Sequence, residues 1–169
     1  TKNGSADLKL LLVFNPHASL GRAAALMPDV LSALESFAKV GVLCTRGRGD
    51  ATRFRAGAAH DAFDGVIAAG GDGTLFEVLN GLYCNDAGNK PPRGLLPVGT
   101  GNAFSRDLGL QPGGWKKGIE IIRAGRKHAV DVGRVQQADG DFHFLNIIGA
   151  GLPVDAMQTA DRMKVFGRS

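Results

Sequence analysis

The sequence predicts an α/β domain with a mostly parallel sheet and helices on both faces, followed by the start of a β-rich second domain. Three observations support this fold class. From residue 8 to residue 125, short apolar runs alternate with stretches whose apolar positions recur at helical spacing, which is the pattern of right-handed β-α-β units. Glycine-rich turns follow two of the apolar runs. After residue 125, two strand-like runs flank a turn, which is typical of a β-hairpin.

The first strand is expected over residues 8–14, where a nearly continuous apolar run ends at Asn15 and Pro16, as in strands that are buried on both faces. Apolar positions spaced by three and four predict a helix over residues 22–37, with an interruption at Pro28 as an open alternative. The same patterns place further strands at residues 40–45, 63–69 and 93–97, and further helices at residues 50–60, 74–83, 103–108 and 115–124.

The chain is predicted to divide into a tail and two domains. Residues 1–7 are small and polar and are expected to form a flexible tail, whereas residues 8–125 form the α/β domain. Residues 126–169 contain strand-like runs at 128–135 and 142–148 and end without a closing strand. We therefore expect this second, β-rich domain to be truncated.

Composition indicates a soluble protein with anionic partners. No apolar run approaches the roughly 18 residues that a membrane-spanning helix needs, and 44% hydrophobic and 21% charged residues are ordinary for a globular chain. The formal net charge of +4 comes from scattered basic residues, which suit anionic ligands or an acidic membrane surface. Nucleic acid is the weaker alternative, because the chain has no recognition motif and few aromatic residues among its charges. Cys44 and Cys84 lie in apolar segments and predict buried thiols in a reducing cytoplasm.

The strongest motif is Gly70-Gly71-Asp72-Gly73-Thr74, which follows a predicted strand and precedes a predicted helix. Glycines there allow a tight turn and bring backbone N–H groups against phosphate oxygens, while the start of the helix adds the positive end of its dipole. A carboxylate at Asp72 beside a triphosphate would act through Mg²⁺ or accept a proton from an attacking hydroxyl, and both roles indicate phosphoryl transfer. The alternative is a simple connection in which Asp72 only caps the helix.

A second glycine turn, Gly99-Thr100-Gly101-Asn102, also follows a strand and opens a helix. Because the carboxyl ends of parallel strands share one edge of a sheet, the turns after the four strands are expected to meet in one crevice. Asn15 and Thr45 would add an amide and a hydroxyl at that edge. A turn asparagine and a strand-end threonine explain these two residues about as well.

These segments resemble the catalytic domain of the diacylglycerol kinase family, which includes bacterial lipid kinases and sphingosine kinases. The segments are NPHASLGR (15–22), TRGRGDA (45–51), GGDGTLFEVLNGL (70–82), LPVGTGNAFSRDLG (96–109) and DVGRV (131–135). The resemblance spans nearly the whole chain and implies an N-terminal domain of the phosphofructokinase and NAD kinase type. It also implies an ATP- and Mg²⁺-dependent enzyme that transfers the γ-phosphoryl group to the hydroxyl of a diacylglycerol-like or sphingoid lipid.

The same resemblance implies roles for individual residues. Asp72 would be the catalytic carboxylate, with a possible link to the metal through Mg-ATP. Glu77 would stabilise the loop or reach the ion, although an exposed acid near the start of a helix is equally compatible with its position. The implied cofactor-binding residues are Asn15, Thr45, Gly70, Gly71, Gly73, Thr74, Glu77, Gly99, Thr100, Gly101 and Asn102.

In the second domain, residues 146–156 resemble the family segment that meets the lipid head group, so Asp155 is the implied substrate-binding residue. Pro153, just ahead of this acid, departs from the common family pattern. We expect a cytoplasmic protein that binds ATP and lipid, contacts the membrane peripherally and binds no nucleic acid, with a homodimer as a possible assembly. Because the second domain is expected to be truncated, inactivity of this chain alone is also an expectation.

Two other functions stay open from the sequence. One is a kinase of the same fold that phosphorylates a soluble substrate such as NAD, since GGDGT also occurs in NAD kinases and phosphofructokinases. The glycine turn at residues 99–102 and the β-rich continuation favour a lipid kinase over that alternative. The other is a non-catalytic module that binds a nucleotide.

Overall fold

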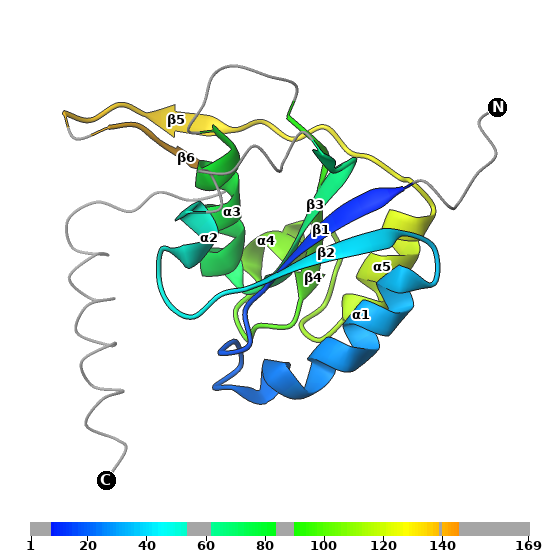
Figure 1. The fold of residues 1–169 in the computed structure, drawn as a ribbon. Coiled ribbons are helices and arrows are strands. Elements are labelled where there is room, and N and C mark those ends of the chain that lie inside the picture. Colours follow the sequence, from blue (N-terminus) through cyan, green and yellow to red (C-terminus); the bar gives the residue numbers. More distant parts are fainter. Residues whose placement is uncertain (1–7, 54–61, 84–89, 139, 146–169) are drawn as a thin grey trace, which may run out of the picture.

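The computed structural model describes residues 8–53, 62–83, 90–138 and 140–145 (Figure 1). Its centre is a four-stranded sheet in the order β2-β1-β3-β4, and every neighbouring pair of strands is parallel. The strands are β1 (Lys9–Phe14), β2 (Lys39–Cys44), β3 (Gly65–Gly70) and β4 (Arg93–Pro97). The expectation of a mostly parallel sheet is confirmed.

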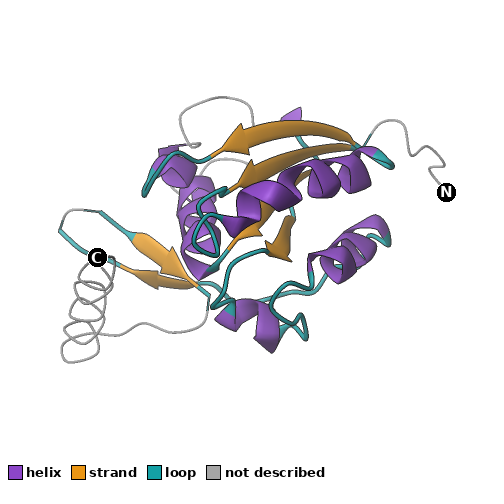
Figure 2. Cartoon of the chain, turned by 90° about the horizontal axis from the view of Figure 1, so that it is seen from below, coloured by secondary structure: helices purple, strands orange, loops and turns teal. Residues whose placement is uncertain are grey.

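Helices cover both faces of this sheet (Figure 2). One face packs against α1 (Met27–Glu35) and α5 (Trp115–Arg123), and the other against α2 (Asp50–Arg53) and α3 (Asp72–Tyr83). Alternation along β1 explains the two layers, because Leu12 and Phe14 join the core under α1 and α5 while Val13 joins the core under α3. All three side chains are fully buried, and each contributes about 1.5–3 kcal/mol of burial free energy.

The predicted helix over residues 22–37 is two elements in the structure. A 3₁₀ helix, η1 (Arg22–Leu26), precedes α1, and Pro28 lies in the first turn of α1. Proline is tolerated there because the first N–H groups of a helix have no intrahelical acceptor. The interruption near Pro28 is therefore confirmed.

Helix α3 begins at Asp72, two residues earlier than the sequence pattern indicates. Gly70 ends β3, Gly71 links the strand to the helix, and Asp72 and Gly73 belong to the first turn of α3. The predicted helix over residues 50–60 is described only as α2, since residues 54–61 lie outside the described residues. A short helix, α4 (Ala103–Asp107), follows the turn after β4.

The predicted hairpin after residue 125 is confirmed. Strands β5 (Gly133–Val135) and β6 (Phe142–Phe144) pair antiparallel. Both are shorter than expected, because residues 128–132 form no strand and the described residues end at Leu145. The boundary between two domains stays a prediction.

The expectation of buried thiols is wrong for Cys44, which is exposed. The residue ends β2, an edge strand, so a neighbouring strand covers it on one side only. Its Sγ lies 3.6 Å from the Sδ atom of Met27. Cys84 lies outside the described residues.

Candidate functional site

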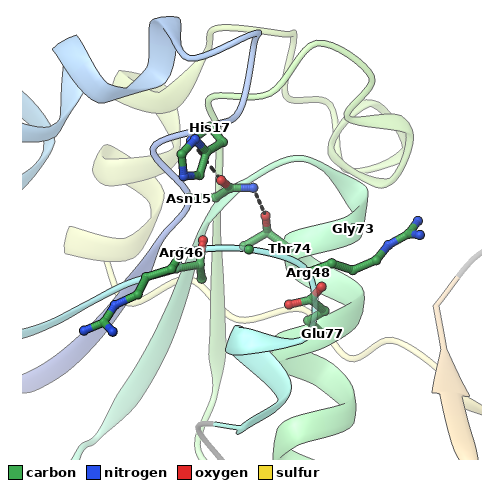
Figure 3. A pocket seen from close by; sticks show the side chains of 9 residues that line it. Asn15, His17, Arg46, Arg48, Gly73, Thr74 and Glu77 are labelled. Atoms are coloured by element: carbon green, nitrogen blue, oxygen red, sulfur yellow. Dashed lines mark hydrogen bonds between the residues drawn. The ribbon is translucent and has the colours of Figure 1, made fainter. Parts of the chain in front are cut away.

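The carboxyl ends of β1, β2 and β3 meet at a cavity of about 390 Å³ (Figure 3). This volume lies within the range of roughly 300–1,000 Å³ that is usual for small-molecule sites. The strand register places Phe14 beside both Cys44 and Ala69, so the segments that follow the three strands start side by side. The cavity is lined by Asn15, His17, Thr45, Arg46, Gly47, Arg48, Gly73, Thr74 and Glu77.

Asn15 is held in place by two hydrogen bonds at this edge. Its Nδ2 donates to Thr74 Oγ1 at 3.1 Å, and its Oδ1 accepts the backbone N–H of His17 at 3.0 Å. The Thr74 side chain packs so closely on Gly70 that a Cβ at that glycine would collide with it. The absence of a side chain at Gly70 therefore allows the contact between the first and third strand ends.

Glu77 holds the loop that follows β2. Its Oε1 accepts the N–H of Gly49 at 2.8 Å, and its Oε2 accepts the N–H of Ala51 at 3.2 Å. The carboxylate is partly buried, and its two partners lie 28 and 26 residues before Glu77 in the sequence. Of the roles considered from the sequence, this geometry supports stabilisation of the loop. Thr45, at the start of the loop, is 5% exposed and lines the cavity.

Asp72 bridges the two glycine turns. Its Oδ2 accepts the N–H of Ala103 at 3.0 Å and its Oδ1 accepts the N–H of Phe104 at 3.1 Å, so it caps α4 rather than its own helix. Each oxygen retains a lone pair beyond the one used. The carboxylate is half-buried at the start of α3. The bond from Gly99 N–H to Gly70 O, 3.0 Å long, joins the same two turns through the backbone.

The second glycine turn lies against the first one and does not line the cavity. Gly99 is buried against Gly71, whereas Thr100 and Gly101 are exposed. Asn102 is 1% exposed, adopts a left-handed backbone with φ +49°, and donates from its Nδ2 to the carbonyl of Gly99. The cavity is thus lined by residues that follow β1, β2 and β3. The 99–102 turn contacts Asp72 and Gly71 outside the cavity.

Three basic side chains at the cavity were not selected from the sequence. Arg46 and Arg48 belong to the loop after β2, and His17 to the loop after β1, and all three are exposed at its rim (Figure 3). Each lies within a segment that carries the family resemblance, one to three residues from a selected residue, and this proximity was the signal in the sequence. The two guanidinium groups make the rim of the cavity electropositive, which favours an anionic ligand.

A magnesium ion fits this site only together with phosphates. In the described part of the chain, no group of three or more His, Cys, Asp and Glu residues lies close enough to hold a metal ion. Mg²⁺ commonly binds one or two carboxylates and completes its shell with phosphate oxygens and water. Asp72 supplies one such carboxylate beside the cavity. Asp155 lies outside the described residues, so its position is not tested.

The fold and this edge define an α/β domain with a polar cavity where the start of α3 meets the loops after β1 and β2. Comparison with known proteins gives the family. The model of the diacylglycerol kinase catalytic domain matches residues 9–135. The chain therefore belongs to the diacylglycerol kinase catalytic domain family.

Individual relatives agree with this assignment. Diacylglycerol kinase from Staphylococcus saprophyticus is 34% identical over 155 residues, which cover 90% of this chain and 48% of the relative. Diacylglycerol kinase from Bacillus subtilis is 44% identical over 103 residues, which cover 61% of this chain and 32% of the relative. A crystal structure of a diacylglycerol kinase from Bacillus anthracis superposes on this structure with a TM-score of 0.63 at 34% sequence identity. The superposition covers 73% of this chain and 42% of the other chain.

The chain spans about half the length of the first of these relatives. The family match covers the residues that form the sheet and the cavity. Within the described ranges, no helix is long and apolar enough to cross a membrane.

Proposed function

We propose that this chain is the nucleotide-binding part of an ATP-dependent lipid kinase, which transfers the γ-phosphoryl group to the hydroxyl of a diacylglycerol-like or sphingoid lipid. The observation that carries the proposal is the cavity at the carboxyl edge of the sheet. Its lining combines the start of α3, the hydroxyls of Thr45 and Thr74, and the cations Arg46 and Arg48. Family membership supports the same chemistry.

In this proposal the residues of the cavity bind and orient the triphosphate. Backbone N–H groups of the first turn of α3 point out of the helix start, where they have no intrahelical acceptor and can donate to phosphate oxygens. Thr74 and Asn15 are hydrogen-bonded to each other and fix the edge of the cavity next to these N–H groups. Arg46 and Arg48 offset the negative charge of the phosphates, and their guanidinium groups suit phosphate geometry.

Asp72 is proposed as the catalytic carboxylate. It stands at the first position of α3, and its two bonds to the start of α4 orient both carboxylate oxygens. Mg²⁺ bound with ATP would neutralise the phosphates. Asp72 would then hold the ion or accept the proton of the attacking lipid hydroxyl, and the fixed orientation of its oxygens serves either role.

The acceptor lipid is proposed to come from a membrane that the protein contacts peripherally in the cytoplasm. The formal net charge of +4 would favour contact with an acidic lipid surface. The chain after residue 125, including Asp155, is proposed to bind the lipid.

Phosphoryl transfer tests the proposal directly. The natural protein that carries this chain is incubated with ATP labelled at the γ-phosphate, Mg²⁺, and either vesicles containing diacylglycerol or soluble NAD. We expect the label in the lipid fraction, and we expect no transfer without Mg²⁺. Transfer to NAD in place of the lipid would contradict the proposed acceptor, and transfer to neither would leave a nucleotide-binding module.

A second prediction concerns Gly73, which lines the cavity in the first turn of α3. A Cβ built at this residue meets no other heavy atom within 4 Å, so Gly73→Ala is expected to leave the melting temperature unchanged or slightly higher. The added methyl group would occupy space meant for a phosphate and weaken ATP binding at least about tenfold, or about 1.4 kcal/mol. Titration calorimetry with ATP checks this, and unchanged affinity in a folded variant would place the phosphates elsewhere.

A further inference from the structure

Helix α3 joins the candidate site to the hairpin formed by β5 and β6 (Figure 1). Thr74, in its first turns, lines the cavity, and Asn80, six residues later, contacts the hairpin. Six residues of α-helix advance about 9 Å along the axis. A single rigid element therefore separates the two contacts.

The Asn80 side chain is 6% exposed and all of its hydrogen-bonding groups are used. Its Nδ2 donates to the carbonyl of Phe76 at 2.9 Å and to the carbonyl of His143 at 2.9 Å. Its Oδ1 accepts the N–H of His143 at 2.7 Å. One amide side chain thus binds both backbone groups of a residue 63 positions away in the sequence.

This pairing lets Asn80 take the place of a neighbouring strand. His143 lies opposite Arg134 in the antiparallel ladder of β5 and β6. In such a ladder, the N–H and C=O of one residue point together either toward the partner strand or away from it. Both groups of His143 point to Asn80, so the side chain of Asn80 caps the outer edge of β6 at this residue.

Aromatic contacts flank the amide without fixing the backbone. The rings of Tyr83 and His143 lie 4.6 Å apart, and the rings of Phe76 and Phe142 lie 6.3 Å apart. Phe76, Asn80 and Tyr83 share one face of α3, since they are spaced by four and three residues. Ring packing is less directional than hydrogen bonding, so the two bonds between Asn80 and His143 set the register between α3 and β6.

We propose that Asn80 is a positioning residue for the acceptor substrate. Its amide fixes the hairpin of β5 and β6 at a set distance from the phosphate end of α3. The inference rests on the proposed function, because it assumes that the chain after residue 125 binds the lipid while the cavity binds ATP. On this basis Asn80 brings the acceptor hydroxyl to the γ-phosphate without touching either substrate.

Asn80→Ala in the natural protein tests the inference with three measurements. Hydrogen exchange of the His143 amide is expected to speed up at least about tenfold, since the amide loses its acceptor. The dissociation constant for ATP stays within about twofold, because the cavity residues are untouched. Lipid turnover, measured as kcat/KM for diacylglycerol, falls about tenfold or more, which corresponds to the loss of one to two hydrogen bonds.

Two further variants make the result specific. Phe76→Leu removes the ring contact with Phe142 but leaves the amide bonds, and it is expected to change kcat/KM for the lipid by less than about threefold. Asn80→Asp keeps the acceptor for the His143 N–H and loses both donors, so it supplies the comparison of lipid turnover with ATP affinity, without the exchange measurement, if Asn80→Ala does not fold. Its kcat/KM for the lipid is expected to fall while ATP binding persists.

The outcomes separate the inference from the proposed function. If the wild-type protein phosphorylates the lipid and Asn80→Ala does so equally well despite faster exchange at His143, the positioning role is overturned and the kinase function stands. Equal losses of ATP affinity and lipid turnover would also overturn it, because they indicate a general loss of structure. If the wild-type protein phosphorylates no lipid, the proposed function fails and the positioning role fails with it.

Discussion

Asp72→Asn is expected to lower the rate of phosphoryl transfer at least about 100-fold while ATP binding persists. Asparagine removes the negative charge that would hold the metal ion or accept the proton of the lipid hydroxyl. Asparagine also has one side-chain oxygen, whereas Asp72 uses two oxygens to accept the N–H groups of Ala103 and Phe104. The cavity itself keeps its lining, because Asp72 is not among the residues that surround it.

Labelled-phosphate transfer and calorimetric titration with ATP, on the same preparation, check this prediction. Asp107→Asn is the matched control, since Asp107 is an exposed carboxylate at the end of the helix that Asp72 caps. The control is expected to show wild-type transfer. If Asp72→Asn also retained transfer, Asp72 would be a structural bridge alone and the catalytic carboxylate would have to be sought outside the described residues.

Gly99→Ala is expected to destabilise the protein by about 2–3 kcal/mol, the usual cost of overpacking a rigid site. A Cβ at Gly99 would lie 2.7 Å from the Cα atom of Gly71 and 2.9 Å from its nitrogen. Both obstacles are backbone atoms, so no side chain can rotate to make room. The two glycine turns would have to separate, which also breaks the bond from Gly99 N–H to Gly70 O.

Urea unfolding followed by circular dichroism measures this cost, and Gly71→Ala serves as the paired control. A Cβ at Gly71 would meet its nearest neighbours at 3.9 Å, an ordinary van der Waals distance. The control is therefore expected to shift the unfolding free energy by less than about 1 kcal/mol. Equal destabilisation by both variants would show that loss of glycine flexibility, rather than the close approach of two backbones, governs this region.

Helix α3 emerges as the element on which the site depends. Asp72 binds the start of α4, Thr74 binds Asn15, Glu77 binds the loop after β2, and Asn80 binds β6. The remaining face of the helix packs on the sheet through Leu75, Val78 and Leu82. Each contact reaches a different segment, so one helix aligns the strand ends, the loop after β2, the start of α4 and the hairpin.

The order of strands and helices was predictable from the sequence because it rests on local patterns. The apolar run of residues 8–14, the helical spacing around Glu77 and the glycine turn at residues 99–102 are each visible in a short window. The convergence of the turns after β1, β2 and β3 on one cavity followed from the parallel arrangement, whereas the turn after β4 does not line that cavity. The parallel sheet of the structure confirms the predicted fold, and the match of the family model confirms the predicted family.

Only the tertiary structure decided how the selected residues are used. Asp72 binds a turn 31 residues later, Glu77 a loop 28 residues earlier, and Asn80 a strand 63 residues later. Side-chain periodicity does not encode such partners, because they depend on which segments the folded sheet brings together. The amino-acid sequence alone determined the elements and the chemistry available at their ends, and packing selected the hydrogen bonds that turn them into one site.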